Sequence, residues 1–274
     1  MLYFRSPAKI NLFLKILGCR NDGFHELASL FQAVSLYDEL SFSCSSKDTF
    51  SCNESTIPTD SRNLVIKARN LFRDKTGLSK PVAITLAKNI PHEAGLGGGS
   101  SNAATTLWAM NELEGNPVST QELILWASEI GSDVPFFLSS GIAYCTGRGE
   151  KLLDVDPLKN FPMITLLKPN ISLSTQSVYQ NLNLKSLNTR DPSDDLLRYS
   201  KGEFVCYNDL QDAAFSQAPE LQLTYDRISK MNFDTVVLSG SGSSFFALGE
   251  GSSQPEDIWC KSVRPVSRDH GYWY

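Results

Sequence analysis

The sequence predicts an α+β protein with two lobes. Segments with the alternation of a strand lie between segments with helical spacing, and they separate into two groups rather than one regular series. Residues 154–160, which carry prolines and charges, mark the change between the groups. We therefore expect an N-terminal domain over 1–153 and a C-terminal domain over 154–274. A chain of 274 residues can bury a core without disulfide or metal support.

The first predicted elements are strands. Residues 8–16 alternate, so a strand there would place apolar residues on one face and Lys9, Asn11, Phe13 and Lys15 on the other. Residues 27–42 are apolar and β-branched enough for further strand, with a turn near Tyr37 and Asp38. The serine-rich residues 43–61 indicate a loop or an edge region.

Helices are predicted next along the chain. Residues 61–76 have helical spacing and Gly77 supplies a C-terminal stop. A strand over 82–88 leads into a glycine-rich segment and then into a second helix. Ser119 and Glu122 form a capping box for a third helix, which closes at Gly131.

The C-terminal group begins with a strand from residue 161. Residues 183–203 are polar and indicate a loop or a short helix, and residues 219–231 indicate a longer helix. Two strands, over 235–239 and 244–248, would form a hairpin around a turn of serines and glycines.

Composition excludes several classes of protein. The chain has 25 Lys+Arg against 30 Asp+Glu, and this net charge of −5 argues against a nucleic-acid binder. A hydrophobic share of 41% and a mean hydropathy of −0.19 are typical of a soluble globular protein. No apolar run reaches the roughly 18 residues of a membrane span, and the first residues lack the pattern of a secretory signal. We expect a cytoplasmic protein with no membrane or nucleic-acid partner.

Cysteine and histidine usage bears on metals and redox state. The six cysteines, at 19, 44, 52, 145, 206 and 260, form no C-x-x-C pair, which favours reduced thiols over a disulfide framework or a zinc site. Three histidines, at 25, 92 and 270, leave little material for a metal centre, so we expect no protein metal site. An anionic ligand must therefore be bound by local groups on an acidic chain.

The glycine segment 95–101 is the strongest candidate for such a group. Glycines allow the backbone to approach a ligand closely, and N–H groups at a helix start bind anions without a lysine. The P-loop pattern fails because no lysine follows the glycines, and G-x-G-x-x-G fails because Ser100 stands at the last glycine position. From the residues alone, phosphate binding and a structural turn remain equal alternatives.

Four separated motifs resemble the GHMP small-molecule kinases. They are Ser6-Pro7-Ala8-Lys9-Ile10-Asn11-Leu12, Pro91-His92-Glu93-Ala94-Gly95-Leu96-Gly97-Gly98-Gly99-Ser100-Ser101, Gly131-Ser132-Asp133-Val134-Pro135 and Ser239-Gly240-Ser241-Gly242. The resemblance implies a lobe similar to ribosomal protein S5 domain 2, a ferredoxin-like α/β lobe, and an active site in the cleft between them. It also implies that residues 91–101 bind ATP, which brings Mg²⁺ with its phosphates and needs no protein metal cage.

A fifth motif narrows the resemblance within that family. Residues 20–27, followed by Phe31 and Gln32, are similar to the members whose acceptor is a methylerythritol linked to cytidine diphosphate, on the non-mevalonate isoprenoid route. The resemblance then implies transfer of phosphate from ATP to the 2-hydroxyl of that substrate. A GHMP kinase for another small alcohol and a non-catalytic nucleotide sensor are the alternatives.

The resemblance assigns Asp133 as general base and Lys9 as its cationic partner. A tertiary alcohol is a weak nucleophile, so a carboxylate is needed to accept its proton as the phosphoryl group arrives. A neighbouring ammonium keeps that carboxylate ionised and offsets charge on the transferring group. Spacing alone favours a turn aspartate and a surface strand lysine.

The resemblance also implies the residues that bind the acceptor. His25 would read the edge of cytosine, Phe24 and Tyr179 would flank the base, and Asn11 would hold substrate hydroxyls. Arg148 would meet the diphosphate, and Thr175 lies in the same segment as Tyr179. Core packing for the aromatic residues and a solvated turn for Arg148 are the alternatives. Glu93 departs from the family, because it places a negative charge where relatives usually have a small residue.

Overall fold

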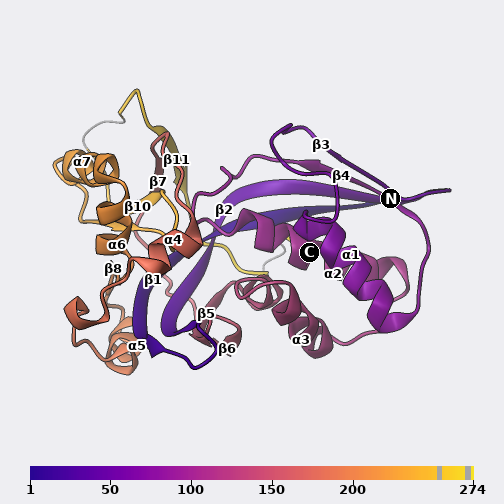
Figure 1. The fold of residues 1–274 in the computed structure, drawn as a ribbon, viewed down its shortest axis with the longest axis horizontal. Helices are drawn as coiled ribbons and strands as arrows, with labels where there is room; N and C mark the ends of the chain where they lie inside the picture. Colours follow the sequence, from indigo (N-terminus) through magenta and orange to yellow (C-terminus); the bar gives the residue numbers. More distant parts are fainter. Residues whose placement is uncertain (252–254, 269–272) are drawn as a thin grey trace.

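The computed structural model describes residues 1–251, 255–268 and 273–274, so His270 lies outside the described residues. The chain forms a larger lobe, in which a sheet carries α1, α2 and α3, and a smaller lobe that contains a second sheet with α4, α6 and α7 (Figure 1). This agrees with the predicted α+β class.

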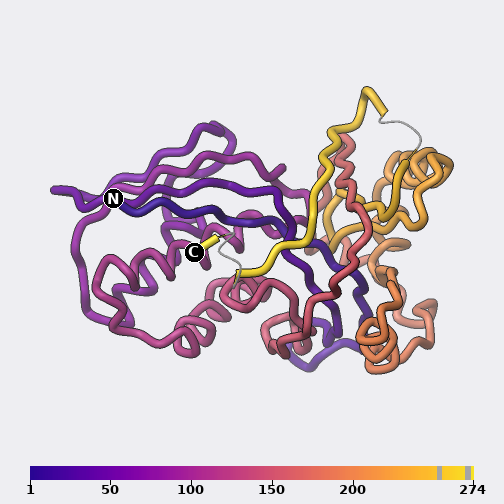
Figure 2. Tube along the Cα trace, turned by 180° about the vertical axis from the view of Figure 1, so that it is seen from behind, coloured from indigo at the N-terminus to yellow at the C-terminus, as the bar shows by residue number. Residues whose placement is uncertain are grey.

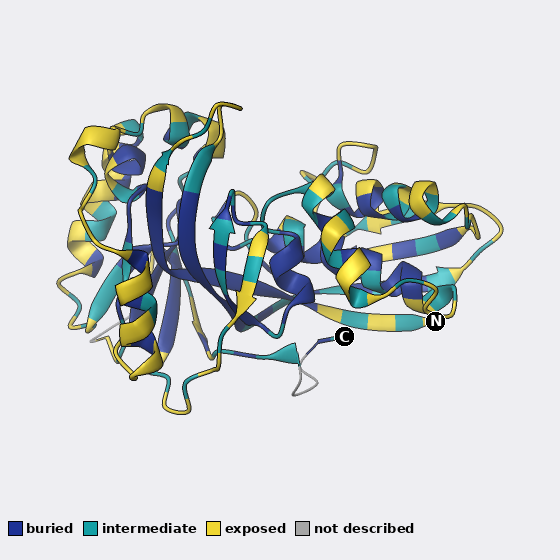
Figure 3. Cartoon of the chain, turned by 90° about the horizontal axis from the view of Figure 1, so that it is seen from below, coloured by how far each residue is buried: buried dark blue, intermediate teal, exposed yellow. Residues whose placement is uncertain are grey.

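The larger sheet has seven strands in the order β3-β4-β2-β1-β8, with β5 paired to β2 and β6 paired to β5. Its two longest strands are antiparallel and reach into both lobes. Buried residues concentrate on the strands, whereas the outer faces of the helices are exposed (Figure 3). The bounds are β1 Leu2–Cys19, β2 His25–Cys44, β3 Thr49–Cys52, β4 Val82–Ala87, β5 Ile142–Gly147, β6 Lys151–Asp154 and β8 Tyr207–Asn208.

The turn predicted near Tyr37 and Asp38 is wrong, because β2 runs through both residues. Asp38 is fully buried and its carboxylate accepts hydrogen bonds from the chain that follows β4. The pairing of β1 with β2 shifts between Pro7 and Ala8, so the irregularity of this region is a bulge rather than a reversal. The loop or edge region predicted over 43–61 contains the short strand β3 at the edge of the sheet.

A second bulge changes which side chains share a face of β1. The register with β2 shifts between Asn11 and Phe13, and such a shift moves every later side chain to the other face. Lys9 and Asn11 therefore stay together, but Lys15 does not share their face as alternation predicts. Lys15 instead forms an ion pair with the buried Asp209, at 3.2 Å between Nζ and Oδ2.

The helices of the larger lobe follow their local signals. The Asn63 side chain accepts from the N–H of Val65 at the start of α1, and Gly77 ends that helix with φ 72°. The predicted capping box of Ser119 and Glu122 is present at the start of α3. The bounds are α1 Leu64–Thr76, α2 Gly98–Leu113, α3 Thr120–Ile130 and the 3₁₀ helix η1 Pro135–Leu138.

The smaller lobe is built on a four-stranded sheet in the order β11-β7-β10-β9. The predicted hairpin of β9 and β10 is confirmed. The strand expected from residue 161 starts at Ile164, since Pro162 has no N–H for a sheet. The bounds are β7 Ile164–Lys168, β9 Thr235–Leu238, β10 Phe245–Leu248, β11 Trp259–Val263, α4 Thr175–Gln180, η2 Leu184–Ser186, α5 Pro192–Ser200, α6 Gln211–Gln217 and α7 Pro219–Ile228.

The last described residues return from the smaller lobe to the larger one, as the yellow end of the trace in Figure 2 shows. Pro265 bridges Val34, and the N–H of Val266 donates to the carbonyl of Ala33. Trp273 is 7% exposed in the core of the larger lobe, and Tyr274 stacks on Trp108 of α2. The domain boundary at residue 153 stays a prediction. The last described residues, which belong to the predicted C-terminal domain, pack on the larger lobe. Within the described residues no helix is long and apolar enough to cross a membrane.

We predict that Trp273→Ala lowers the free energy of unfolding by about 3–5 kcal/mol, because it removes a large buried ring from the core. Trp259→Ala is the comparison variant, since Trp259 is 38% exposed and its loss should cost less, about 1–2 kcal/mol. Denaturant unfolding of both variants measures the difference. Equal losses would contradict the packing of Trp273 described above.

Candidate active site

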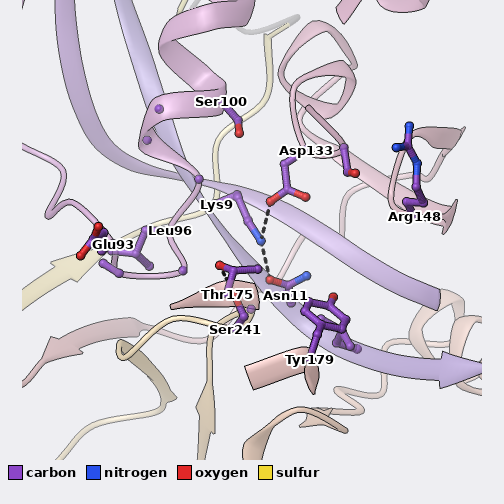
Figure 4. Close-up of a pocket in the computed structure, with 18 of the residues that line it drawn as sticks. Lys9, Asn11, Glu93, Leu96, Ser100, Asp133, Arg148, Thr175, Tyr179 and Ser241 are labelled. Atoms are coloured by element: carbon purple, nitrogen blue, oxygen red, sulfur yellow. Dashed lines mark hydrogen bonds and ion pairs between the residues drawn. The ribbon is translucent and has the colours of Figure 1, made fainter. Parts of the chain in front are cut away.

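A cavity of about 900 Å³ lies where the two lobes meet, within the size range of small-molecule sites. Both lobes line it, so its walls come from segments far apart in the sequence (Figure 4). The larger lobe contributes β1, the glycine segment and the turn after α3, and the smaller lobe contributes α4 and the turn between β9 and β10.

The glycine segment forms one wall, and two of its glycines are sterically required. Gly95 and Gly97 have φ of 72° and 71°, a region that side chains rarely adopt. A Cβ on Gly95 would lie 2.0 Å from the carbonyl oxygen of Ser239, and a Cβ on Gly97 would lie 2.9 Å from Cγ of Lys9. Helix α2 then starts at Gly98 with its N-terminus in the cavity wall, an arrangement that favours an anion.

Lys9 and Asp133 meet in the middle of the cavity. Lys9 Nζ lies 3.3 Å from Asp133 Oδ2 and donates to Asn11 Oδ1 at 2.6 Å. The ammonium also lies 4.5 Å from the centre of the Phe31 ring. The Lys9 side chain is 3% exposed and that of Asp133 is 33% exposed. The cation is therefore held inside the fold, while the carboxylate remains open to a ligand.

The serine–glycine turn 239–242 closes the site from the smaller lobe. The Ser239 hydroxyl donates to the carbonyl of Gly95 at 3.1 Å. Gly240 and Ser241 line the cavity beside Lys9 and Asn11. The hydroxyls of Ser241 and Thr175 are hydrogen-bonded at 2.8 Å, which places the start of α4 against this turn.

Aromatic and basic side chains gather at the other end of the cavity. The rings of His25 and Tyr179 lie 5.2 Å apart, and the Arg148 guanidinium lies 4.9 Å from the centre of the Phe24 ring. Phe24 is 51% exposed, which argues against the core packing that the sequence left open for it. Burial, with the nearby Asp133 carboxylate, raises the pKa of the Tyr179 phenol, so the ring stays neutral.

The predicted site residues come together with two exceptions. Lys9, Asp133, Asn11, Phe24, His25, Arg148, Thr175 and Tyr179 line one cavity with nine members of the segment 91–101. His92 is exposed, and the fully buried hydroxyl of Ser101 accepts a hydrogen bond from that of Ser6 at 2.8 Å. Neither residue is part of the cavity wall, so of the two serines in the segment 91–101 it is Ser100 that lines the cavity.

Sequence reasoning missed Lys88, which also lines the cavity. A Cβ on Gly98 would lie 3.0 Å from its Nζ, so the ammonium stands beside the start of α2. The P-loop pattern has its lysine after the glycines, whereas this lysine precedes them. The signal was its place at the end of the predicted strand 82–88, directly before the glycine segment.

Among the described residues, no group of three or more His, Cys, Asp or Glu side chains is arranged to hold a metal ion. Side chains near the start of α2 that suit a hard cation are the hydroxyl of Ser100 and the carboxylate of Asp133. A magnesium ion that brings most of its own ligands, from phosphates and water, fits such a wall.

The chain is similar to known small-molecule kinases along nearly its whole length. The family described as GHMP kinases N terminal domain matches residues 63–141. A 4-diphosphocytidyl-2-C-methyl-D-erythritol kinase of Protochlamydia amoebophila (strain UWE25) is 48% identical over 269 residues, which cover 98% of this chain and 91% of that protein. A crystal structure of 4-(cytidine 5'-diphospho)-2C-methyl-D-erythritol kinase superposes with a TM-score of 0.77 at 32% identity and covers 96% of this chain and 99% of that one. A homoserine kinase from Cytophaga hutchinsonii shares the fold with a TM-score of 0.70 at 19% identity, over 97% of this chain and 95% of that one.

We predict that Gly95→Ala destabilises the protein more than Gly115→Ala does. Both glycines have positive φ, 72° and 84°, so both substitutions carry the same backbone strain. Only at Gly95 would the new methyl group meet another backbone, and we expect this to cost about 1–3 kcal/mol more. Denaturant unfolding measures the difference. Equal destabilisation would show that the turn 239–242 does not pack on the glycine segment as described.

Proposed function

Because the chain belongs to the 4-diphosphocytidyl-2-C-methyl-D-erythritol kinase family of the GHMP kinases, we propose that it transfers the γ-phosphoryl group of ATP to the 2-hydroxyl of 4-diphosphocytidyl-2-C-methyl-D-erythritol. The products would be the 2-phosphate and ADP. The enzyme is a small-molecule kinase, and its relatives place that role in isoprenoid biosynthesis. A cytoplasmic location remains part of the proposal.

The observation that carries this proposal is the Lys9–Asp133 pair between a helix N-terminus and an aromatic subsite. In the proposed reaction the substrate hydroxyl gives its proton to the Asp133 carboxylate as its oxygen bonds to the γ-phosphorus. The bond from that phosphorus to the β–γ bridging oxygen breaks, and ADP keeps the electron pair. Lys9 stabilises the Asp133 anion before transfer and the charge on the phosphoryl oxygens during it.

The glycine segment is proposed to bind the ATP phosphates. Gly97, Gly98 and Gly99 bring the backbone up to the ligand, and the dipole of α2 points its positive end at the same place. Magnesium, when bound with ATP, neutralises phosphate charge, and the Ser100 hydroxyl is placed to contact it. Glu93 has φ 52° and lines the same wall. Its carboxylate therefore adds negative charge close to where the ATP phosphates are proposed to bind.

The aromatic end of the cavity is proposed to bind the cytidine diphosphate. Tyr179 and Phe24 offer ring faces for the base, where stacking contributes roughly 1–3 kcal/mol, and the His25 imidazole can donate or accept at the edge of cytosine. Arg148 is half-buried beside Phe24 and can pair with a phosphate. Asn11 and Thr175 lie nearer Lys9, where the polyol would extend.

Another small alcohol is the second candidate substrate, because homoserine kinase shares this fold. Homoserine and mevalonate carry no base, so they leave the rings of Phe24, His25 and Tyr179 without a partner. A nucleotide sensor without activity would have no use for a carboxylate that is paired with a buried lysine and open to the cavity. Both alternatives therefore explain fewer of the lining residues.

We predict that ADP release, measured in a coupled assay, responds to the diphosphocytidyl substrate and not to mevalonate, homoserine or galactose. The physical reason is that base stacking and the Arg148–diphosphate pair supply binding that a base-free alcohol cannot make. Comparable turnover with any base-free alcohol would contradict the proposed cytosine subsite. Absence of ADP release with every substrate would favour the sensor.

We predict that Asp133→Asn lowers kcat by about 10²-fold or more, since the amide keeps the shape but cannot accept the proton. ATP affinity, measured by titration calorimetry, should stay within about threefold because the phosphates rest on the glycine segment. Asp156→Asn is the control, as that side chain is exposed in the segment between β6 and β7. A near-normal kcat for Asp133→Asn would refute its role as the base.

A further inference from the structure

Asp38 is a buried carboxylate that the proposed reaction does not use. It lies within β2, is 0% exposed, and accepts four hydrogen bonds. The N–H groups of Asn89 and Ile90 donate to Oδ1, both at 2.8 Å. Lys88 Nζ and Asn102 Nδ2 donate to Oδ2, the second at 3.0 Å. Such a carboxylate is fully satisfied and has no lone pair left for a ligand.

The partners of Asp38 come from both ends of the glycine segment. Asn89 and Ile90 come just before residues 91–101, and Asn102 directly follows them in α2. One carboxylate therefore ties the beginning and the end of the segment to the same point of the sheet. A segment rich in glycine has little side-chain packing of its own, so such a tie limits its backbone freedom.

The fourth partner, Lys88, links this network to the cavity. Its side chain is 8% exposed, yet the residue lines the cavity with Gly98, the first residue of α2. A buried ammonium needs a fixed anionic partner, and Asp38 is that partner. The arrangement holds a positive charge beside the helix N-terminus where the nucleotide phosphates are proposed to bind.

We propose that Asp38 is a positioning residue for nucleotide binding, which fixes both ends of the glycine segment and holds Lys88 at the start of α2. This inference rests on the proposed function. A residue that only stabilises the fold would affect both ligands. Loss of the Asp38 carboxylate should instead weaken binding of the nucleotide and leave binding of the cytidylyl substrate unchanged.

The test is titration calorimetry of a non-hydrolysable ATP analogue and, separately, of the diphosphocytidyl substrate. We expect Asp38→Asn to lose about tenfold or more in affinity for the ATP analogue, since a displaced loop loses several phosphate contacts at once. Affinity for the cytidylyl substrate should stay within about twofold, because none of the four Asp38 partners belongs to the aromatic end.

Asp209→Asn is the matched control. Asp209 is also buried, also pairs with a lysine, Lys15, and also accepts from a backbone N–H, that of Ile16. Lys15 and Asp209 stand apart from the glycine segment, so this variant should lose thermal stability but keep its affinity for the ATP analogue. An equal loss of nucleotide affinity in both variants would overturn the proposal.

A double variant, Asp38→Asn with Lys88→Met, separates binding from folding. It removes both charges together, which avoids an unpaired buried lysine and keeps the protein folded if Asp38→Asn alone does not fold. Lys88→Met alone measures the share of nucleotide affinity that the ammonium supplies. A further loss of nucleotide affinity in the double variant, with normal cytidylyl affinity, supports the proposal, and an affinity equal to that of Lys88→Met alone overturns it. If the wild-type chain binds no ATP analogue, the proposed function fails together with this inference. If the wild type binds it and Asp38→Asn binds equally well, the inference alone fails.

Discussion

The site depends on a lysine that is almost completely buried. An ammonium taken out of water is costly unless anions, polar atoms or aromatic faces replace its hydration. Lys9 is 3% exposed and has all three kinds of partner, in Asp133, Asn11 and Phe31. These partners come from the turn after α3 and from the strands β1 and β2, so satisfying the lysine also assembles the centre of the site. The backbone N–H of Lys9 further donates to the carbonyl of Leu96, which joins the same strand to the glycine segment.

The long ribbon of β1 and β2 makes that assembly possible. Each strand passes from one lobe into the other, and the bulge between Asn11 and Phe13 changes the facing of β1 on the way. Before the bulge, Lys9 and Asn11 face the cavity. After it, Lys15 turns to Asp209, and the two lysines of one strand serve two different places. A straight strand would have put both ammonium groups on one face, where the Asp133 carboxylate is already paired with Lys9.

Features set by neighbouring residues were predictable from the sequence, and features set by distant contacts were not. The capping box of Ser119 and the stop at Gly77 depend on a few adjacent residues, and both are present. The resemblance to family motifs predicted that Lys9, Asp133 and the aromatic residues line one site, and they line one cavity. The hydrogen bond between Ser6 and Ser101 inside the fold could not be predicted, because these residues are 95 positions apart. A turn was predicted at Asp38 because an aspartate in an apolar run is typical of a turn, but β2 continues through this residue. Here its acceptors are filled by groups 50 or more residues away, among them Lys88 and Asn102.

The two lysine–aspartate pairs beside the glycine segment show why only one carboxylate can serve as base. Asp38 is 0% exposed and its two oxygens already accept four hydrogen bonds, so a substrate hydroxyl has neither access nor a free lone pair. Asp133 is 33% exposed, is paired through one oxygen with Lys9, and keeps capacity toward the cavity. The two lysine–aspartate pairs are chemically identical, and they differ in how many of the carboxylate's hydrogen-bonding positions are already filled. In the proposed reaction the closed pair would hold the nucleotide loop in place, and the open pair would accept the proton. Under the proposed function, the phosphates of two ligands would meet the N-terminus of α2 and the placed cations Lys9, Lys88 and Arg148 rather than a basic surface, which is compatible with a net charge of −5.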